Sequence, residues 1–157
     1  MEIERKFLIN NMPDLSLYES HKLVQGYLNT SPTVRVRKED DEYYMTYKGK
    51  GQNGGIAREE YNLPLTKEAY EHMIVKSDGN IISKTRYLIP LGKNKEGSEL
   101  TAELDVFDEP FAPLCFVEVE FPTIEEAMNF EKPDWMGQDV SDDREYYNSY
   151  LSTKKFD

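Results

Sequence analysis

Cysteine is nearly absent from this sequence: Cys115 is the single cysteine among 157 residues, so no disulfide can form within the chain. Because Cys115 lies between Leu114 and Phe116, we interpret it as a small buried thiol rather than as a nucleophile. The two histidines, His21 and His72, are isolated in the sequence, and we interpret both as structural or solvated residues. The sequence therefore offers no Ser-His-Asp or Cys-His constellation for covalent catalysis.

Long hydrophobic runs are also missing. The first residues are mostly charged and lack the apolar stretch of a signal peptide, and no later segment approaches the roughly 20 residues of a membrane span. We therefore expect a cytoplasmic protein without a membrane partner. Hydrophobic residues make up 38% of positions 1-157, which is enough for one core but hardly for two, so we expect a single domain.

Positive charge is in short supply as well. The chain has 19 lysines and arginines against 30 acidic residues, for a net charge of −11. Such a field repels nucleic acid and anionic membranes, and no basic run would suit an RNA strand, so we expect no nucleic-acid partner. Any polyanionic ligand must be met by locally concentrated cations or by metal ions. An acidic exterior with many tyrosines is compatible with a homodimer.

One glycine-rich stretch, Gly49 to Gly55, superficially resembles a phosphate-binding loop. A Walker loop requires Lys-Ser or Lys-Thr after its last glycine and then a helix. Here Gly55 is followed by Ile56-Ala57-Arg58 and a strand-like run. We therefore predict a hairpin loop at this position.

Most segments alternate with a period of two, which indicates β-strands. Helices are predicted only over Thr66 to Lys76, Thr123 to about Glu131 and about Asp143 to Ser152. The sequence thus predicts an α+β fold dominated by β-structure. In each strand one face is apolar and the other carries ionic groups. These groups are Glu2, Glu4 and Lys6; Arg35 and Arg37; Lys48; Lys84 and Arg86; Glu103 and Asp105; and Glu118 and Glu120.

Two architectures fit this alternation. In an open sheet the charged face would meet water, where ion pairs contribute little, and alternation alone favours this arrangement. In a closed barrel the charges would face inward and the helices would pack outside. The charges segregate into pairs of like sign, however, and such pairs repel unless a counter-ion lies between them. An enclosed wall with one acidic and one basic sector would suit a metal-bound polyphosphate.

The ordered series of motifs resembles the CYTH superfamily, also called triphosphate tunnel metalloenzymes. The family hallmark, Glu-x-Glu-x-Lys on an N-terminal strand, stands here as Glu2-Ile3-Glu4-Arg5-Lys6. The closing segment, Tyr147-Asn148-Ser149-Tyr150-Leu151 included, looks like that of the compact bacterial members of inorganic triphosphatase type. The motifs between them are Gln25-Gly26-Tyr27-Leu28, Arg35-Val36-Arg37, Lys48, Arg58-Glu59-Glu60, Lys84-Thr85-Arg86-Tyr87, Glu103-Leu104-Asp105, Glu118-Val119-Glu120 and Pro133-Asp134-Trp135-Met136-Gly137.

The resemblance implies a closed antiparallel β-tunnel of about eight strands with a charged interior. It implies Mg²⁺ or Mn²⁺ as cofactor, with Lys6 and Tyr27 linked to activation of the attacking water. The implied metal sector consists of Glu2, Glu4, Glu118 and Glu120, with Glu60 and Asp105 as candidates for a second ion or its waters. The implied phosphate cradle consists of Lys6, Arg35, Arg37, Lys48, Arg58, Lys84 and Arg86, with Glu103 orienting the cations through ion pairs.

The chain departs from the family pattern at one position. Many relatives carry Arg-x-Glu-x-Glu where this chain reads Arg58-Glu59-Glu60-Tyr61-Asn62, so Asn62 replaces the second carboxylate. If that position supports a second ion, binding there should be weaker or water-mediated here. Single-metal chemistry stays compatible with the sequence.

The implied activity is hydrolysis of inorganic triphosphate to pyrophosphate and phosphate, by in-line attack of water on a terminal phosphorus. The first strand begins at residue 2, which leaves little material for a nucleobase or thiamine pocket. The alternatives are a class IV adenylyl cyclase that converts ATP to cyclic AMP, a thiamine triphosphatase and, least favoured, an RNA triphosphatase. A non-catalytic polyphosphate-binding module is also considered, but it would not need the intact set of Glu2, Glu4, Lys6 and Glu118.

Overall fold

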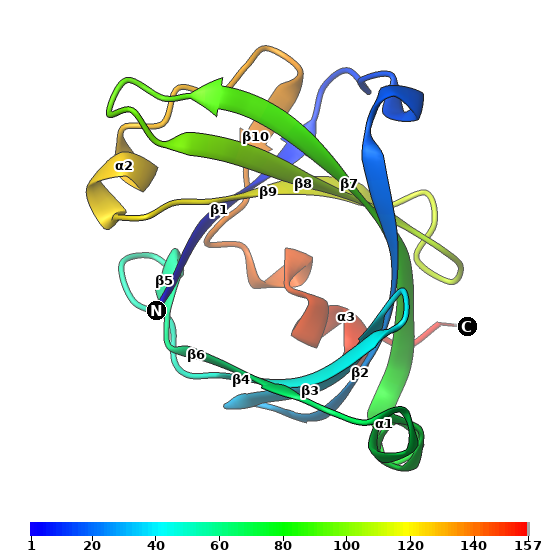
Figure 1. Ribbon diagram of the computed structural model, residues 1–157. Coiled ribbons are helices and arrows are strands. Elements are labelled where there is room, and N and C mark those ends of the chain that lie inside the picture. The colour runs from blue at the N-terminus through cyan, green and yellow to red at the C-terminus, as the bar shows by residue number, and fades with distance from the viewer. Residues whose placement is uncertain (157) are drawn as a thin grey trace.

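The alternating segments form one antiparallel sheet that curls into a nearly closed barrel, as the computed structural model of residues 1–156 shows (Figure 1). The order of strands around the sheet is β10-β1-β9-β8-β7-β2-β3-β4-β6, and β5 pairs with β1. The strands are β1 (Glu2–Ile9), β2 (Glu19–Thr30), β3 (Thr33–Glu39), β4 (Glu42–Lys48), β5 (Ala57–Arg58), β6 (Glu60–Pro64), β7 (Asp78–Lys93), β8 (Glu99–Phe107), β9 (Cys115–Glu120) and β10 (Met136–Asp139).

The barrel closes through β5 and β6, which are two parts of one extended segment interrupted at Glu59. β5 pairs with the start of β1, where Glu2 lies opposite Arg58, and β6 pairs with β4. Counting β5 and β6 as one strand, the circuit through β1, β9, β8, β7, β2, β3 and β4 has the predicted number of about eight strands. β10 is an addition that pairs with the second half of β1. The predicted closed antiparallel barrel is confirmed. The open sheet is wrong because the segment of β5 and β6 pairs with β1 through β5 and with β4 through β6.

The two faces of the sheet have opposite character. The inner face carries buried charges, among them Lys84, which is 0% exposed. The main apolar core lies on the outer face of β1, β7, β8 and β9, where Leu104, Val117 and Val119 are completely buried. Trp135 packs against this core, as expected of an anchor for the final segment. Hydrophobic burial outside the barrel therefore stabilises a wall whose inside is free to hold charges.

Two helices cover the outside of the barrel. α1 contacts β2, β3 and β4, and α2 contacts β1. Each begins where a threonine hydroxyl accepts a backbone N–H bond: Thr66 from Ala69, and Thr123 from Glu126 in the predicted capping box. α2 ends earlier than the predicted Glu131, because Asn129 closes the last turn. The helices are α1 (Lys67–Ile74), α2 (Ile124–Met128) and α3 (Asn148–Thr153), with single turns η1 (Leu15–Leu17) and η2 (Arg144–Tyr146). None of the helices within residues 1–156 is long and apolar enough to cross a membrane.

The third predicted helix, about Asp143 to Ser152, is wrong as a continuous helix. Asp143 caps the single turn η2, and Tyr147 then adopts an extended conformation with φ −76° and ψ 135° before α3 begins. The expectation that all helices pack outside is also wrong for α3, which packs on β2 and β7 across one end of the barrel (Figure 1). The reason is a second apolar cluster on the inner face, in which Leu151 packs with Tyr27, Ile82, Phe107 and Phe116.

Candidate active site

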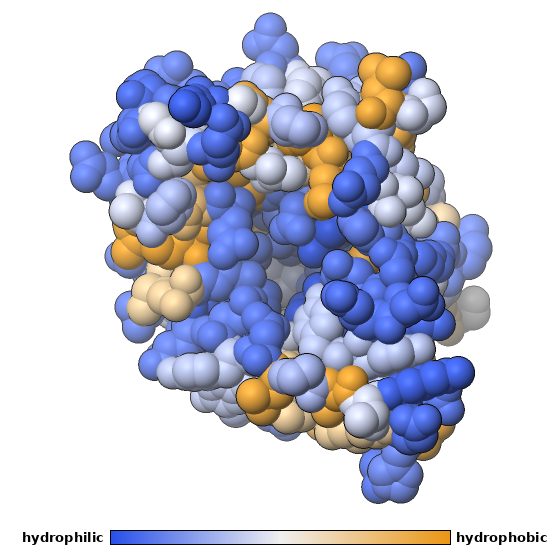
Figure 2. Space-filling model, in the orientation of Figure 1, coloured by the Kyte–Doolittle hydropathy of each residue, from blue (hydrophilic) through white to orange (hydrophobic). Residues whose placement is uncertain are grey.

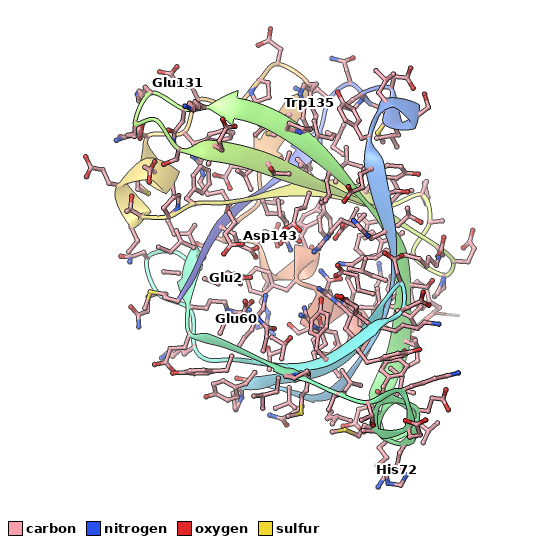
Figure 3. All side chains as sticks on the ribbon, viewed as in Figure 1. Glu2, Glu60, His72, Glu131, Trp135 and Asp143 are labelled. Atoms are coloured by element: carbon pink, nitrogen blue, oxygen red, sulfur yellow. The ribbon has the colours of Figure 1, made fainter. Side chains whose placement is uncertain are left out.

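The barrel encloses a cavity of about 370 Å³. A space-filling view shows the hollow between hydrophilic walls (Figure 2). Glu2 and Glu60 point into the barrel, whereas His72 and Trp135 lie on its outside (Figure 3). All but one of the predicted site residues line this cavity: Glu2, Glu4, Lys6, Tyr27, Arg35, Arg37, Lys48, Arg58, Glu60, Lys84, Arg86, Glu103, Glu118 and Glu120. The exception is Asp105.

The acidic sector comes from the neighbouring strands β1 and β9, where Glu4 lies opposite Glu120 and Lys6 lies opposite Glu118. Burial and the nearby Glu118 carboxylate raise the pKa of Glu4 well above its ordinary value. Burial also disfavours charge on Glu118, but the Lys6 ammonium and a hydrogen bond with Glu4 hold the pKa of Glu118 well below its ordinary value. The pKa values of the two carboxyl groups are therefore pushed apart, in opposite directions.

A second acidic pair, Glu2 and Glu60, surrounds a lysine. Lys48 Nζ lies 2.9 Å from Glu2 Oε1 and 3.5 Å from Glu60 Oε2. Burial raises the pKa of Glu2 to about 7 even though the charge of Lys48 opposes the shift. Asn62 donates to Glu60 Oε1 at 3.0 Å and accepts from the Thr46 hydroxyl at 2.6 Å. The structure thus places Lys48, expected on the phosphate wall, between carboxylates of the acidic sector.

The acidic sector fits a hard divalent cation. Its donors are carboxylate oxygens, which Mg²⁺ and Mn²⁺ prefer. Burial is the main cause of the raised pKa values of Glu2 and Glu4, and neighbouring carboxylates add to it. Within residues 1–156, no three acidic or imidazole side chains stand close enough together to enclose an ion unaided. Waters or phosphate oxygens would therefore have to complete the coordination shell.

The basic sector lies on β3 and β7. Arg35 and Arg37 are 7% and 5% exposed, respectively. Burial and the charge of Arg35 lower the pKa of Arg37. Arg37 Nε donates to Gln25 Oε1 at 2.8 Å, whereas the buried Nε of Arg35 has no partner within the described residues. Since an unpaired buried donor is costly, Arg35 is a group that a bound anion would satisfy.

Asp105 is not brought to the cavity wall. It is completely buried, with Oδ2 2.7 Å from Lys84 Nζ and Oδ1 2.8 Å from Arg86 Nε. Burial opposes its ionisation, but the charges of Arg86 and Lys84 lower the pKa of Asp105. Burial lowers the pKa of Lys84 to about 7 despite the charge of Asp105. Glu103 accepts from Arg86 Nη1 at 3.2 Å. The geometry therefore gives Asp105 a role in orienting cations, not in coordinating an ion.

Lys6 stands at the boundary between the two sectors. Its Nζ donates to the Tyr146 carbonyl at 2.7 Å, lies 3.9 Å from Glu118 Oε1 and sits 4.4 Å from the centre of the Phe116 ring. Tyr27, the second candidate for water activation, is buried and its hydroxyl accepts from Gln25 Nε2 at 3.2 Å. Both side chains line the cavity.

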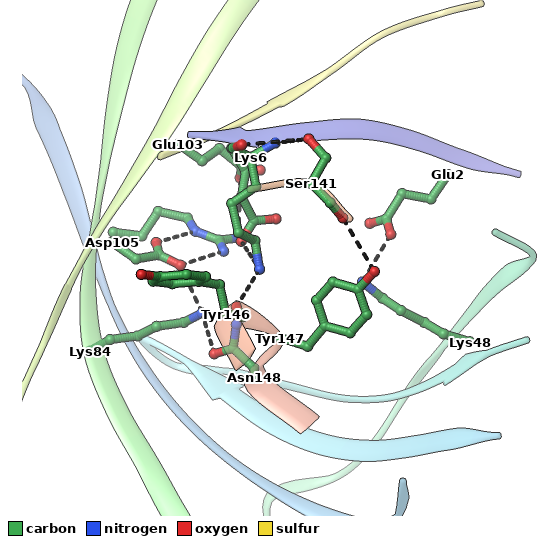
Figure 4. A network of polar contacts seen from close by, with 12 residues as sticks. Glu2, Lys6, Lys48, Lys84, Glu103, Asp105, Ser141, Tyr146, Tyr147 and Asn148 are labelled. Carbon is green, nitrogen blue, oxygen red and sulfur yellow. Dashed lines mark hydrogen bonds and ion pairs between the residues drawn. The ribbon is translucent and has the colours of Figure 1, made fainter. Parts of the chain in front are cut away.

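Sequence reasoning missed the contribution of the C-terminal segment to the wall. The Tyr147 ring lies 5.6 Å from the guanidinium of Arg58, and its hydroxyl donates to the Ser141 carbonyl at 3.2 Å (Figure 4). A side chain at Gly55 would meet that hydroxyl at 2.6 Å, which explains the glycine there. The closing motif contains Tyr147 and Asn148, but nothing in its spacing indicates that it folds back into the barrel. The other unpredicted lining residues are Thr33, Glu39, Tyr44, Gly55, Asn62, Ser141, Asn148 and Ser149.

Comparisons with known proteins agree with this geometry. The CYTH domain family matches residues 1–156. The inorganic triphosphatase of Nitrosomonas europaea is 39% identical over 155 residues, which cover 96% of each chain. That of Acetivibrio thermocellus is 35% identical over 153 residues, covering 96% of this chain and 92% of its own. A crystal structure of an inorganic triphosphatase matches with a TM-score of 0.68 at 35% identity, over 99% of this chain and 96% of that one.

Proposed function

Because the chain belongs to the CYTH domain family, we propose that it hydrolyses inorganic triphosphate to pyrophosphate and phosphate with Mg²⁺ or Mn²⁺. The observation that carries this proposal is the cavity itself, in which buried carboxylates on β1 and β9 share one space with buried cations on β3 and β7. Two relatives of nearly the same length are named inorganic triphosphatases, and this supports the choice of substrate.

Carboxylates among Glu2, Glu4, Glu118 and Glu120 would contribute oxygens to the ion, and waters or phosphate oxygens would complete its coordination shell. When bound, the ion would neutralise phosphate charge and draw the triphosphate toward the acidic sector. Glu4 and Glu118 suit such a cation because their hydrogen-bonded carboxyl groups lie side by side in the acidic sector. Asn62 donates to Glu60 and adds no negative charge, so this side of the cavity would hold a second ion only weakly.

The buried cations would bind and orient the triphosphate. Arg35 and Arg37 offer planar donors, and the free Nε of Arg35 supplies one that no protein group uses within residues 1–156. Lys84 and Arg86 extend from β7, two strands away from β3 in the sheet, and are held by Asp105. Prepositioned cations in a buried site can stabilise the charge that spreads over the phosphate oxygens during transfer.

Water would attack a terminal phosphorus without a covalent intermediate. Within residues 1–156, neither histidine nor cysteine lines the cavity, and positioning and electrostatics would supply most of the acceleration. Lys6 adjoins Glu118, where an ion and an attacking water would meet, and we assign it to contact with the water or the reacting phosphate. We assign Tyr27 to assisting Lys6, because Tyr27 lines the same cavity.

The test is release of phosphate from inorganic triphosphate, ATP and thiamine triphosphate in parallel, each with Mg²⁺, Mn²⁺ or chelator. We expect metal-dependent release that is fastest from inorganic triphosphate. Cyclic AMP formed from ATP without phosphate release would instead make the protein a cyclase. If no product formed from any substrate but triphosphate bound tightly, the protein would be a binding module.

A further inference from the structure

The segment after β10 supplies one polar side chain to the cavity that the proposed chemistry does not use. Asn148 is the first residue of α3, after Tyr147 at the N-cap. Asparagine often caps helices by accepting a backbone N–H bond, but the carboxamide of Asn148 makes no such bond within residues 1–156. It is turned toward Lys84 of β7 instead (Figure 4).

The carboxamide oxygen of Asn148 accepts two hydrogen bonds, one from each of the paired strands β7 and β2. Lys84 Nζ donates at 3.0 Å and Gln25 Nε2 donates at 3.2 Å. Both donors belong to residues that are 0% exposed. Gln25 cannot turn its amide around, because its own oxygen accepts from Arg37 Nε at 2.8 Å. Donors thus fix the orientation of both amides, and each bond would be costly to leave unmade.

Through these bonds Asn148 connects the two halves of the basic sector. On one side Gln25 holds Arg37 of β3. On the other side Lys84 of β7 is held by Asp105, which also holds Arg86. Lys84 therefore has two acceptors, Asp105 from the neighbouring strand β8 and Asn148 from α3, which packs on β7.

We propose that Asn148 is a positioning residue: its carboxamide oxygen fixes the Lys84 ammonium and the Gln25 amide, so that the C-terminal segment completes the phosphate-binding wall. The effect on kinetics rests on the proposed function, because it requires turnover of triphosphate. The effect on the position of Lys84 does not depend on that function. A hydrogen bond to a charged group is strong enough that its loss should lower kcat/KM by about tenfold or more, chiefly through KM.

Two substitutions separate this role from a general effect on α3. Asn148→Ala removes the acceptor, and Asn148→Asp keeps an acceptor but adds a negative charge near the phosphates. The matched control is Asn80→Ala, because Asn80 of β7 donates to the carbonyls of Leu151 and Lys154 at the other end of α3. This control loosens the docking of the helix without touching Lys84.

The direct readout is the ammonium signal of Lys84 in ¹⁵N-lysine-labelled protein without substrate, at pH 6, where the group is charged. Lys84→Arg assigns the signal by removing it. An ammonium held by two acceptors exchanges slowly with water. We expect the signal to persist in the wild type, Asn148→Asp and Asn80→Ala, and to broaden or vanish in Asn148→Ala. An unchanged signal in Asn148→Ala would overturn the proposal, as would equal loss in Asn80→Ala.

The kinetic readout is KM and kcat for inorganic triphosphate in the same variants. KM should rise in Asn148→Ala and further in Asn148→Asp, while Asn80→Ala stays within about twofold of wild type. If Asn80→Ala matched Asn148→Ala, helix docking would explain the effect and the proposal would fail. If the wild type failed to turn over triphosphate, the proposed function would fall, and the Lys84 signal would still decide the role of Asn148.

Discussion

Glu2 should make the metal-free protein less stable as the pH rises. Burial raises the pKa of this carboxyl from 4.5 to about 7, so the folded state binds the proton more tightly than the unfolded chain. A group with a raised folded pKa contributes stability that is complete below its unfolded pKa and is lost as the pH rises through its folded pKa. The loss should therefore lie between about pH 4.5 and pH 7.

The size of this loss follows from the shift. At 1.4 kcal/mol per pKa unit, it amounts to about 3 kcal/mol in the free energy of unfolding. For a chain of this length that corresponds to roughly 10 °C in melting temperature. Glu2→Gln mimics the protonated side chain at every pH, so its stability relative to wild type should improve by about this amount between pH 5 and pH 8. Constant effects of the substitution cancel in that comparison.

The assay is thermal unfolding of wild type, Glu2→Gln and Glu59→Gln in the presence of chelator at pH 5 and pH 8. Glu59 is an exposed carboxylate between β5 and β6, so its variant should follow the wild type at both pH values. Adding Mg²⁺ at pH 8 should stabilise the wild type more than Glu2→Gln. If the curves of Glu2→Gln and wild type ran parallel, the reasoning about the buried carboxyl of Glu2 would be refuted.

Four further substitutions test the assigned roles. Glu4→Gln should abolish metal-dependent turnover without unfolding the protein, whereas Glu125→Gln on the outside of α2 should leave turnover intact; phosphate release measures both. Arg37→Ala should lower kcat/KM by roughly 10- to 100-fold, mainly through KM, and an unchanged KM would remove it from the phosphate wall. Tyr27→Phe should lower kcat by roughly 100-fold with little change in affinity, and wild-type turnover would exclude its assisting role. Asp105→Asn leaves Lys84 and Arg86 poorly compensated, so thermal unfolding should show a loss of about 3–5 kcal/mol in the free energy of unfolding. Added triphosphate should restore part of this stability, whereas full stability without triphosphate would contradict the role of Asp105.

The inner and outer faces of the barrel could be predicted because alternation fixes which residues share a face of a strand. Arg35 with Arg37 and Glu118 with Glu120 stand on their strands as their spacing required. Closure of the sheet could not be obtained this way, since an open sheet shows the same alternation. It depends on the two-residue pairing of β5 with β1, and the resemblance to a family supplied that expectation.

The end of the barrel that α3 covers could not be predicted from periodicity. The inner face is not charged throughout, because it carries Ile82, Phe107 and Phe116 as well as Lys84 and Glu118. They form a floor on which Leu151 of α3 packs. Contacts that join residues so distant in the sequence leave no local pattern, and for this reason Asn148 was missed.

Hydrolysis of inorganic triphosphate in ¹⁸O-labelled water with Mg²⁺, followed by ³¹P NMR, tests the central claim most directly. If a cation-lined cavity orients water for attack on a terminal phosphorus, one ¹⁸O atom should appear in orthophosphate and none in pyrophosphate, and chelator should stop the reaction. Label in pyrophosphate would place the attack on the central phosphorus. That result, or hydrolysis that continues in chelator, would contradict the account.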